Sequence, residues 1–138
     1  MGRKADMAMI ADLKKELERE AEEQNIPILR AAERKLLLDT AAEADPKRIL
    51  EVGTAVGYSA LLLAERLPLA EIDTIEIDAL RNERAISVMQ AAGFEQRVRC
   101  HLGDAGEVLP TLTGLYDFIY LDGPKGQYFR HLKLIEPK

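Results

Sequence analysis

The stretch that most constrains the fold runs from Arg48 to Ala60 and reads Arg-Ile-Leu-Glu-Val-Gly-Thr-Ala-Val-Gly-Tyr-Ser-Ala. Its beginning is apolar and predicts a buried strand. The segment from Gly53 to Gly57 predicts a tight loop, because glycine adopts backbone conformations that other residues avoid. A helical pattern begins at Tyr58. A strand, a glycine loop and a helix N-terminus in this order present free backbone N–H groups to a ligand. The alternative is an ordinary strand–loop–helix connection that binds no ligand, in which the glycines only allow close packing.

The spacing of the glycines narrows the choice of ligand. A dinucleotide-binding loop needs G-x-G-x-x-G, whereas Ala55 takes the place of the middle glycine. Glu51 stands at the end of the predicted strand, where a carboxylate repels a pyrophosphate and attracts a cation. S-adenosylmethionine carries a sulfonium and an amino-acid end. The pattern therefore favours this cofactor over NAD.

Composition limits the class of protein. A chain of 138 residues with 47% hydrophobic residues indicates one soluble globular domain. The net charge of −5 argues against broad, nonspecific nucleic-acid binding. The single Cys100 excludes an internal disulfide, no zinc pattern occurs, and we expect this cysteine to be buried on a strand. There is no signal segment and no apolar run that spans a membrane, so we expect a cytoplasmic protein with no membrane partner.

Strands and helices alternate along the chain. We expect helices over residues 4–24, 29–44, 58–67, 79–92, 105–112 and 128–135, and strands over residues 48–52, 72–77, 97–102 and 117–121. In the helix over 79–92, Ile86, Val88 and Met89 are expected to point inward and Gly93 to end the helix.

This alternation favours a parallel sheet with right-handed crossovers. The predicted fold is α/β, a Rossmann-like parallel sheet with flanking helices. It is incomplete, with about four strands in the order 3-2-1-4, and N-terminal helices precede it. We divide the chain into an N-terminal helical segment, 1–45, and a cofactor-binding half-domain, 46–138.

Polar residues follow every predicted strand. Ligands bind beyond the carboxyl ends of parallel strands, so these residues are expected to line one crevice: Glu51 and Gly53, Glu76 and Asp78, Asp104 and Ala105, and Asp122. Glu76 follows Gly53 by 23 residues, near the spacing of roughly 20 at which an acid binds a ribose diol; a solvated acid is the alternative. Asp104 either accepts a hydrogen bond from an adenine amine or caps the helix that begins at residue 105.

Asp122 and Lys125 form the pair of residues in the sequence that most suggests catalytic chemistry. A carboxylate can hold a divalent metal, and a lysine with a lowered pKa can act as a general base. One carboxylate alone is a poor metal site. The alternative to a general base is that Lys125 is an ordinary surface lysine in a turn. His101 and His131 have no partner at metal or triad spacing. We interpret His101 as a strand residue and His131 as a helix-surface residue.

Four motifs occur in a fixed order: Glu51-Val-Gly-Thr-Ala-Val-Gly-Tyr-Ser59, Thr74-Ile-Glu-Ile-Asp78, Gly103-Asp-Ala105, and Tyr116-Asp-Phe-Ile-Tyr-Leu-Asp-Gly-Pro-Lys-Gly-Gln-Tyr128. From about residue 25 to the last residue, the chain resembles class I S-adenosylmethionine-dependent O-methyltransferases. The nearest branch is the metal-dependent one. It includes catechol and caffeoyl-CoA O-methyltransferases and bacterial enzymes that methylate 5-hydroxyuridine in tRNA.

The resemblance implies roles for individual residues. The methionine end of the cofactor would be bound by Glu51, Gly53, Thr54 and Ser59. Glu76 would bind the ribose, Ala105 the adenine region, and Leu29 would lie over the cofactor. Asp122 would be the first ligand of Mg²⁺ or another divalent cation, and Lys125 would help to deprotonate the acceptor hydroxyl.

The implied activity is methyl transfer to a hydroxyl of a catechol-like small molecule with divalent-metal assistance. The alternatives are methylation of wobble 5-hydroxyuridine in tRNA, and a cofactor-binding module without turnover. Methylation of tRNA needs a basic face, for which the candidates are Arg81, Arg84, Arg97, Arg99, Lys125 and Arg130.

The chain departs from the family in two ways. Gly123 stands where the family usually has alanine, and the family's three further strands and second metal-ligand cluster have no counterpart before Lys138. The resemblance therefore implies a truncated or split methyltransferase. The strand over 117–121 would then be an open apolar edge, so we expect a homo-oligomer, such as a dimer, formed through that edge or the N-terminal helix.

Overall fold

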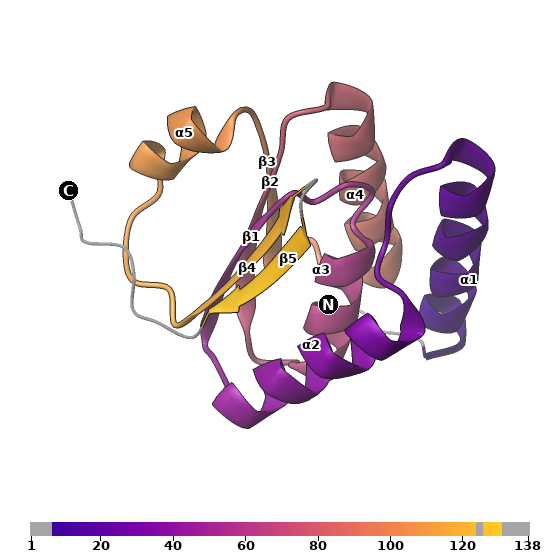
Figure 1. Ribbon diagram of the computed structural model, residues 1–138, viewed down its shortest axis with the longest axis horizontal. Coiled ribbons are helices and arrows are strands. Elements are labelled where there is room, and N and C mark those ends of the chain that lie inside the picture. The colour runs from indigo at the N-terminus through magenta and orange to yellow at the C-terminus, as the bar shows by residue number, and fades with distance from the viewer. Residues whose placement is uncertain (1–6, 124–125, 131–138) are drawn as a thin grey trace.

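A single five-stranded sheet organises the described part of the chain, residues 7–123 and 126–130 of a computed structural model (Figure 1). The sheet order is β3-β2-β1-β4-β5. Its strands are β1 (Arg48–Val52), β2 (Glu71–Glu76), β3 (Val98–Leu102), β4 (Phe118–Gly123) and β5 (Gly126–Arg130). The first four strands are parallel, which confirms the predicted α/β fold and the order 3-2-1-4.

The helices cover one face of the sheet much more fully than the other (Figure 1). One face is covered by α1 (Met7–Gln24), α2 (Ala31–Ala44), α3 (Tyr58–Arg66) and α4 (Ala79–Ala92). The other face carries the short α5 (Ala105–Val108) and a 3₁₀ turn (Leu109–Thr111). Strand residues alternate between the two faces, so Ile49 and Ile72 belong to the larger core and Leu50 and Ile75 to the smaller one.

The N-terminal helices are part of the larger core. Buried residues of α1 and α2, among them Leu17 and Leu37, belong to the same apolar cluster as the buried residues of α3. No helix of the described residues has the length and apolar character that a membrane crossing requires.

The predicted helix over 128–135 is wrong for the residues that the structure describes. Residues 126–130 form β5, which pairs antiparallel with β4, and Gly123 lies opposite Gly126. Two successive strands that pair antiparallel form a β-hairpin, and aromatic residues such as Tyr128 and Phe129 favour strands. Residues 131–135 lie outside the described part.

This hairpin also corrects the expected open edge of the fourth strand. The register of β4 and β5 places Ile119 opposite Arg130 and Leu121 opposite Tyr128. The backbone groups of β4 are therefore paired on both sides, with β1 and with β5.

One inward position of α4 is also wrong. Val88 and Met89 are buried as expected, but Ile86 is 37% exposed. Residues two positions apart lie on nearly opposite sides of a helix, so Ile86 and Val88 cannot share a face. The predicted end of the helix is confirmed, because Gly93 has φ +80° and its N–H donates to the carbonyls of Met89 and Gln90.

Candidate functional site

A pocket of about 460 Å³ opens at the carboxyl ends of β1, β2 and β3. Parallel strands end at the same edge of a sheet, so the residues that follow them come together there. The expected crevice is confirmed for four predicted positions, since Gly53, Glu76, Asp104 and Ala105 all line it. The remaining lining residues are Pro27, Val52, Ala55, Ile75, Ile77, Arg81 and Gly103.

The glycine loop between β1 and α3 forms one wall of this pocket. Gly53 has φ +98° and donates its N–H to the carbonyl of Ile75 at 2.8 Å. Gly57 has φ +91°, and a Cβ there would lie 3.2 Å from the Cα of Ala85. A larger residue at position 57 would strain the backbone and crowd α4. The loop is therefore as tight as the sequence predicts.

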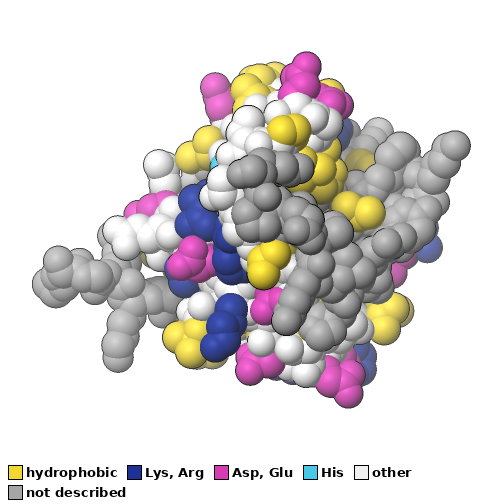
Figure 2. Space-filling model, turned by 90° about the vertical axis from the view of Figure 1, so that its left-hand side faces the viewer, with side chains coloured by type: hydrophobic (Ala, Val, Ile, Leu, Met, Phe, Trp, Pro, Cys, Tyr) yellow, Lys and Arg dark blue, Asp and Glu magenta, His cyan; other side chains and the backbone are white. Residues whose placement is uncertain are grey.

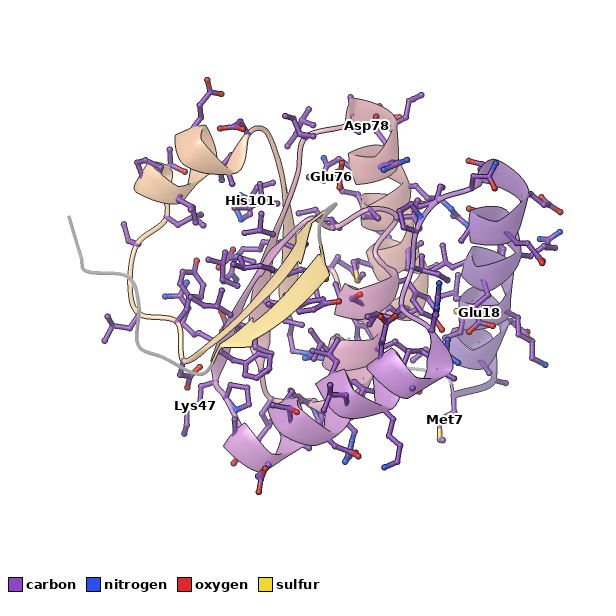
Figure 3. All side chains as sticks on the ribbon, viewed as in Figure 1. Met7, Glu18, Lys47, Glu76, Asp78 and His101 are labelled. Atoms are coloured by element: carbon purple, nitrogen blue, oxygen red, sulfur yellow. The ribbon has the colours of Figure 1, made fainter. Side chains whose placement is uncertain are left out.

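Glu76 joins the end of β2 to the glycine loop. Its Oε1 accepts a hydrogen bond from the N–H of Ala55 at 2.7 Å, and its Oε2 accepts one from the N–H of Asp78 at 2.9 Å. Glu76 is only 6% exposed, so the alternative of a solvated acid is wrong. A carboxylate has about four acceptor positions, so Glu76 retains acceptor capacity. Figure 3 shows Glu76 and Asp78 where β2 leads into α4.

Asp104 caps α5 and lines the pocket. Its Oδ2 accepts a hydrogen bond from the N–H of Gly106 at 2.9 Å, which confirms the capping role. The adenine-binding role stays a prediction, since capping occupies one of the two carboxylate oxygens.

Four predicted cofactor-binding residues are not part of the pocket lining. Glu51, Thr54, Ser59 and Leu29 are buried and are not among the lining residues. Glu51 Oε1 accepts a hydrogen bond from Thr74 Oγ1 at 2.6 Å, and that hydroxyl lies 2.5 Å from Thr54 Oγ1.

Thr74 is a supporting residue that the sequence reasoning missed. It holds Glu51 and Thr54 together under the glycine loop. The signal that identifies it is the sheet register, because Thr74 lies opposite Glu51 in the pairing of β1 with β2. That register requires the parallel alignment of two strands and is not readable from either strand alone.

Three other lining residues had no predicted place in the pocket. Pro27 belongs to the connector between α1 and α2, Ile77 is 69% exposed, and Arg81 lies on the first turn of α4. Ile77 directly follows β2, so the rule that ligands bind beyond the carboxyl ends of parallel strands also applies to it. Arg81 Nε lies 3.8 Å from Asp78 Oδ2.

Cys100 lies on β3 as predicted and is half-buried. Burial, together with the charge of Glu51, raises the pKa of this thiol to about 11. The thiol is therefore protonated at neutral pH and is a poor nucleophile.

The predicted metal ligand and base fall at the limit of the described residues. Asp122 lies opposite Gln127 in the β4–β5 pairing, its side chain is not described, and Lys125 lies outside the described residues. Within the described ranges, no three His, Cys, Asp or Glu side chains are grouped so that they can hold a metal.

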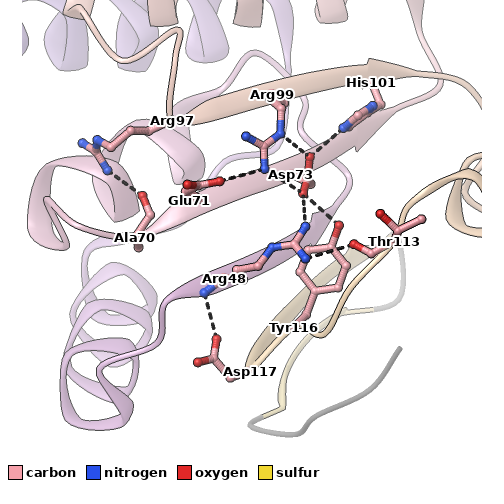
Figure 4. A network of polar contacts seen from close by, with 10 residues as sticks. All are labelled: Arg48, Ala70, Glu71, Asp73, Arg97, Arg99, His101, Thr113, Tyr116 and Asp117. Carbon is pink, nitrogen blue, oxygen red and sulfur yellow. Dashed lines mark hydrogen bonds and ion pairs between the residues drawn. The ribbon is translucent and has the colours of Figure 1, made fainter. Parts of the chain in front are cut away.

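Three of the arginines considered for tRNA binding are engaged within the molecule. Arg84 is bound by Glu16 and Glu20, while Arg97 and Arg99 bind partners on or near the sheet (Figure 4). The face drawn in Figure 2 likewise shows basic side chains interspersed with acidic ones. The described surface thus lends no support to a basic face built from these three arginines.

Comparison with known proteins gives consistent matches. Residues 4–136 match the O-methyltransferase family. A probable O-methyltransferase of Mycobacterium tuberculosis is 34% identical over 136 residues, which cover 91% of this chain and 58% of that protein. The catechol O-methyltransferase of Sus scrofa is 33% identical over 107 residues, which cover 72% of this chain and 58% of that protein.

Solved structures share the fold. An O-methyltransferase of Bacillus cereus in complex with S-adenosylhomocysteine (SAH) has a TM-score of 0.73 and 26% identity, over 83% of this chain and 55% of that one. The O-methyltransferase TomG of Streptomyces achromogenes, in complex with S-adenosylmethionine, has a TM-score of 0.71 and 32% identity, over 88% of this chain and 56% of that one. The chain spans little more than half the length of these proteins.

Proposed function

This chain belongs to the O-methyltransferase family, and we propose that the pocket at the carboxyl ends of β1–β3 binds S-adenosylmethionine. The observation that carries the proposal is the convergence of Gly53, Glu76, Asp104 and Ala105 on one pocket. These positions come from three of the four motifs by which the sequence resembles such enzymes. The complexes of the solved relatives with this cofactor or with SAH support the same assignment.

The chemistry of the lining residues fits this cofactor. Glu76 retains acceptor positions for a ribose diol, and the apolar Pro27, Val52 and Ile77 suit a planar base. The buried carboxylate of Glu51 lies under the glycine loop, where negative charge favours a cationic ligand. When bound, the cofactor supplies an electrophilic methyl group on its sulfonium.

We propose that the acceptor is a hydroxyl of a catechol-like small molecule. The catechol O-methyltransferases among the relatives support this class of acceptor, and the engagement of Arg84, Arg97 and Arg99 gives no support to tRNA. Assistance by Mg²⁺, with Asp122 as ligand and Lys125 as base, stays a prediction from the resemblance. The described residues do not complete a metal site.

A calorimetric titration with SAH tests the pocket. We expect the wild-type chain to bind and Glu76→Gln to weaken binding by about 10-fold, because the amide loses the charged acceptor for hydroxyl groups. Glu71→Gln is the matched control, because Glu71 lies at the opposite end of β2. This variant should bind SAH as tightly as the wild type. Since Glu76 also holds the N–H of Ala55, thermal unfolding of each variant separates loss of folding from loss of binding. A folded wild-type chain that binds no SAH contradicts the proposal.

Turnover is tested separately, with labelled S-adenosylmethionine, catechol and Mg²⁺. Methyl transfer that EDTA abolishes supports a metal-assisted enzyme. Cofactor binding without transfer to catechol supports the alternative of a binding module.

A further inference from the structure

Tyr58 occupies a junction beside the pocket. It is the first residue of α3, directly follows Gly57 of the glycine loop, and is 2% exposed. Its hydroxyl donates a hydrogen bond of 2.5 Å to Oε2 of Glu18 on α1. Its ring lies beneath Arg34 of α2, whose guanidinium carbon is 5.9 Å from the ring centroid. One side chain thus joins the glycine loop to both N-terminal helices, and Figure 3 labels Glu18 on α1.

The same contacts reach another segment that lines the pocket, the connector between α1 and α2. Arg34 Nη1 donates a hydrogen bond to the carbonyl of Leu29 at 3.2 Å. Leu29 lies in the connector between α1 and α2, two residues after Pro27, which lines the pocket. The connector and the glycine loop face the same space, and both are tied to Tyr58.

Packing alone does not explain why residue 58 carries a hydroxyl. A phenylalanine would fill the same buried volume without the cost of burying a polar group. Burial and the hydrogen bond to Glu18 both raise the pKa of Tyr58, so the phenol is protonated and acts as a donor at neutral pH. What the hydroxyl adds is a directed bond between α3 and α1.

We propose that Tyr58 is a positioning residue for cofactor binding, because its hydrogen bond to Glu18 holds the α1–α2 connector against the glycine loop. This inference rests on the proposed function. Without the bond, the connector and the loop occupy the binding-competent arrangement for a smaller fraction of the time. The apparent affinity for the cofactor falls by that fraction.

Titrations with SAH test this role in Tyr58→Phe, Glu18→Ala and the double variant. Each single change should raise the dissociation constant about 10-fold, as expected for a lost hydrogen bond to a charged group. The double variant should be no weaker than the weaker single variant, because both changes remove the same bond. Additive losses in the double variant would overturn the coupling.

Glu65→Gln is the matched control. Glu65 Oε1 lies 2.6 Å from Lys14 Nζ, so this pair also joins α3 to α1, but Glu65 is at the end of α3 that is distant from the glycine loop. Its loss should leave the dissociation constant unchanged. An equal effect of Glu65→Gln would overturn the specific role of Tyr58 and indicate general loosening of α1.

Hydrogen exchange of the cofactor-free protein gives a second readout. The N–H of Ala55 is bonded to Glu76 and that of Gly57 to the carbonyl of Thr54. Both amides should exchange faster in Tyr58→Phe and remain at the wild-type rate in Glu65→Gln. A Tyr58→Phe variant that binds SAH as tightly as the wild type overturns the positioning role and leaves the proposed cofactor intact. A folded wild-type chain that binds no SAH overturns the proposed function, and the positioning role with it.

Discussion

The carboxylate of Asp73 is the most heavily bonded side chain on the thinly covered face of the sheet (Figure 4). It is 2% exposed and accepts hydrogen bonds from Arg99 Nε at 3.0 Å and the Tyr116 hydroxyl at 2.8 Å; His101 Nε2 lies 2.8 Å away. Arg48 Nη2 lies 3.2 Å from the same carboxylate. His101 is thus a strand residue as predicted, but it has a carboxylate partner that its sequence spacing did not indicate.

The partners of Asp73 control its titration. Burial raises its pKa, but the hydrogen bonds from Arg99, His101 and Tyr116 outweigh burial and hold the pKa below its ordinary value of 3.8. A carboxyl group whose pKa is lowered by folding stabilises the protein above the unfolded pKa. This stabilisation is lost as the pH falls through the folded pKa.

We expect Asp73→Asn to lower the free energy of unfolding by about 3 kcal/mol at pH 7, because it leaves Arg48 and Arg99 without their buried counter-charge. The loss should shrink as the pH falls below 3.8, where wild-type Asp73 also becomes protonated. Urea unfolding at a series of pH values measures both effects. Asp39→Asn, at an exposed carboxylate on α2, is the control and should change little. An unfolding free energy of Asp73→Asn that parallels the wild type at every pH would contradict this account.

At the level of elements, α1 is held to the domain by an apolar stripe and by charged contacts. Ile10, Leu13, Leu17 and Ala21 are buried, and their spacing places them on one face of the helix. Arg84 of α4 forms ion pairs with two glutamates of this helix. Arg84 Nη2 lies 3.0 Å from Glu16 Oε2 and 2.6 Å from Glu20 Oε2. These contacts hold α1 against α4, beside the connector that contains Pro27.

We expect Arg84→Met to destabilise the protein by about 1 kcal/mol, since the ion pairs are partly exposed and the methionine retains most of the packing of the stem. Salt screens such pairs, so the difference from the wild type should narrow in about 1 M NaCl. Denaturant unfolding at two salt concentrations measures the effect. Lys35→Met is the control, because its pair with Asp39 is exposed and lies within α2. A loss that salt does not change would mean that packing, and not charge, is responsible.

At the level of the whole molecule, the β4–β5 hairpin changes the expected mode of self-association. The edges of the described sheet are β3 and β5, so β4 offers no free backbone groups to a second copy. Homo-oligomer formation stays a prediction. The outer edge of β5, or the N-terminal helix, is now the expected contact.

Light scattering during size-exclusion chromatography, over a range of concentrations, measures this association. We expect the mass to rise above the 15.4 kDa of one chain as the concentration increases. Phe129→Lys places a charge on the edge strand and should reduce the association if β5 forms the contact. A constant mass of one chain at all concentrations would contradict the prediction.

Local sequence patterns predicted most of the fold. The apolar run that begins at Arg48, the glycines of the loop and the alternation of strands with helices predict β1, α3 and the parallel sheet, because each signal lies within a few neighbouring residues. The crevice at the strand ends also followed, since the topology of a parallel sheet brings those ends together whatever the side chains are.

Partners distant in the chain account for what the sequence did not reveal. Residues 126–130 form a strand because β4 lies beside them and offers backbone partners, an influence that helical spacing does not register. The register of adjacent strands brings Thr74 to Glu51 and brings Arg48 and Arg99 to Asp73. Tyr116 reaches Asp73 from the segment that precedes β4. Periodicity assigns a residue to an element and a face. Contacts between segments that lie far apart in the sequence decide which neighbour the residue has across the sheet. That neighbour in turn decides the charge state of the residue and its role near the pocket.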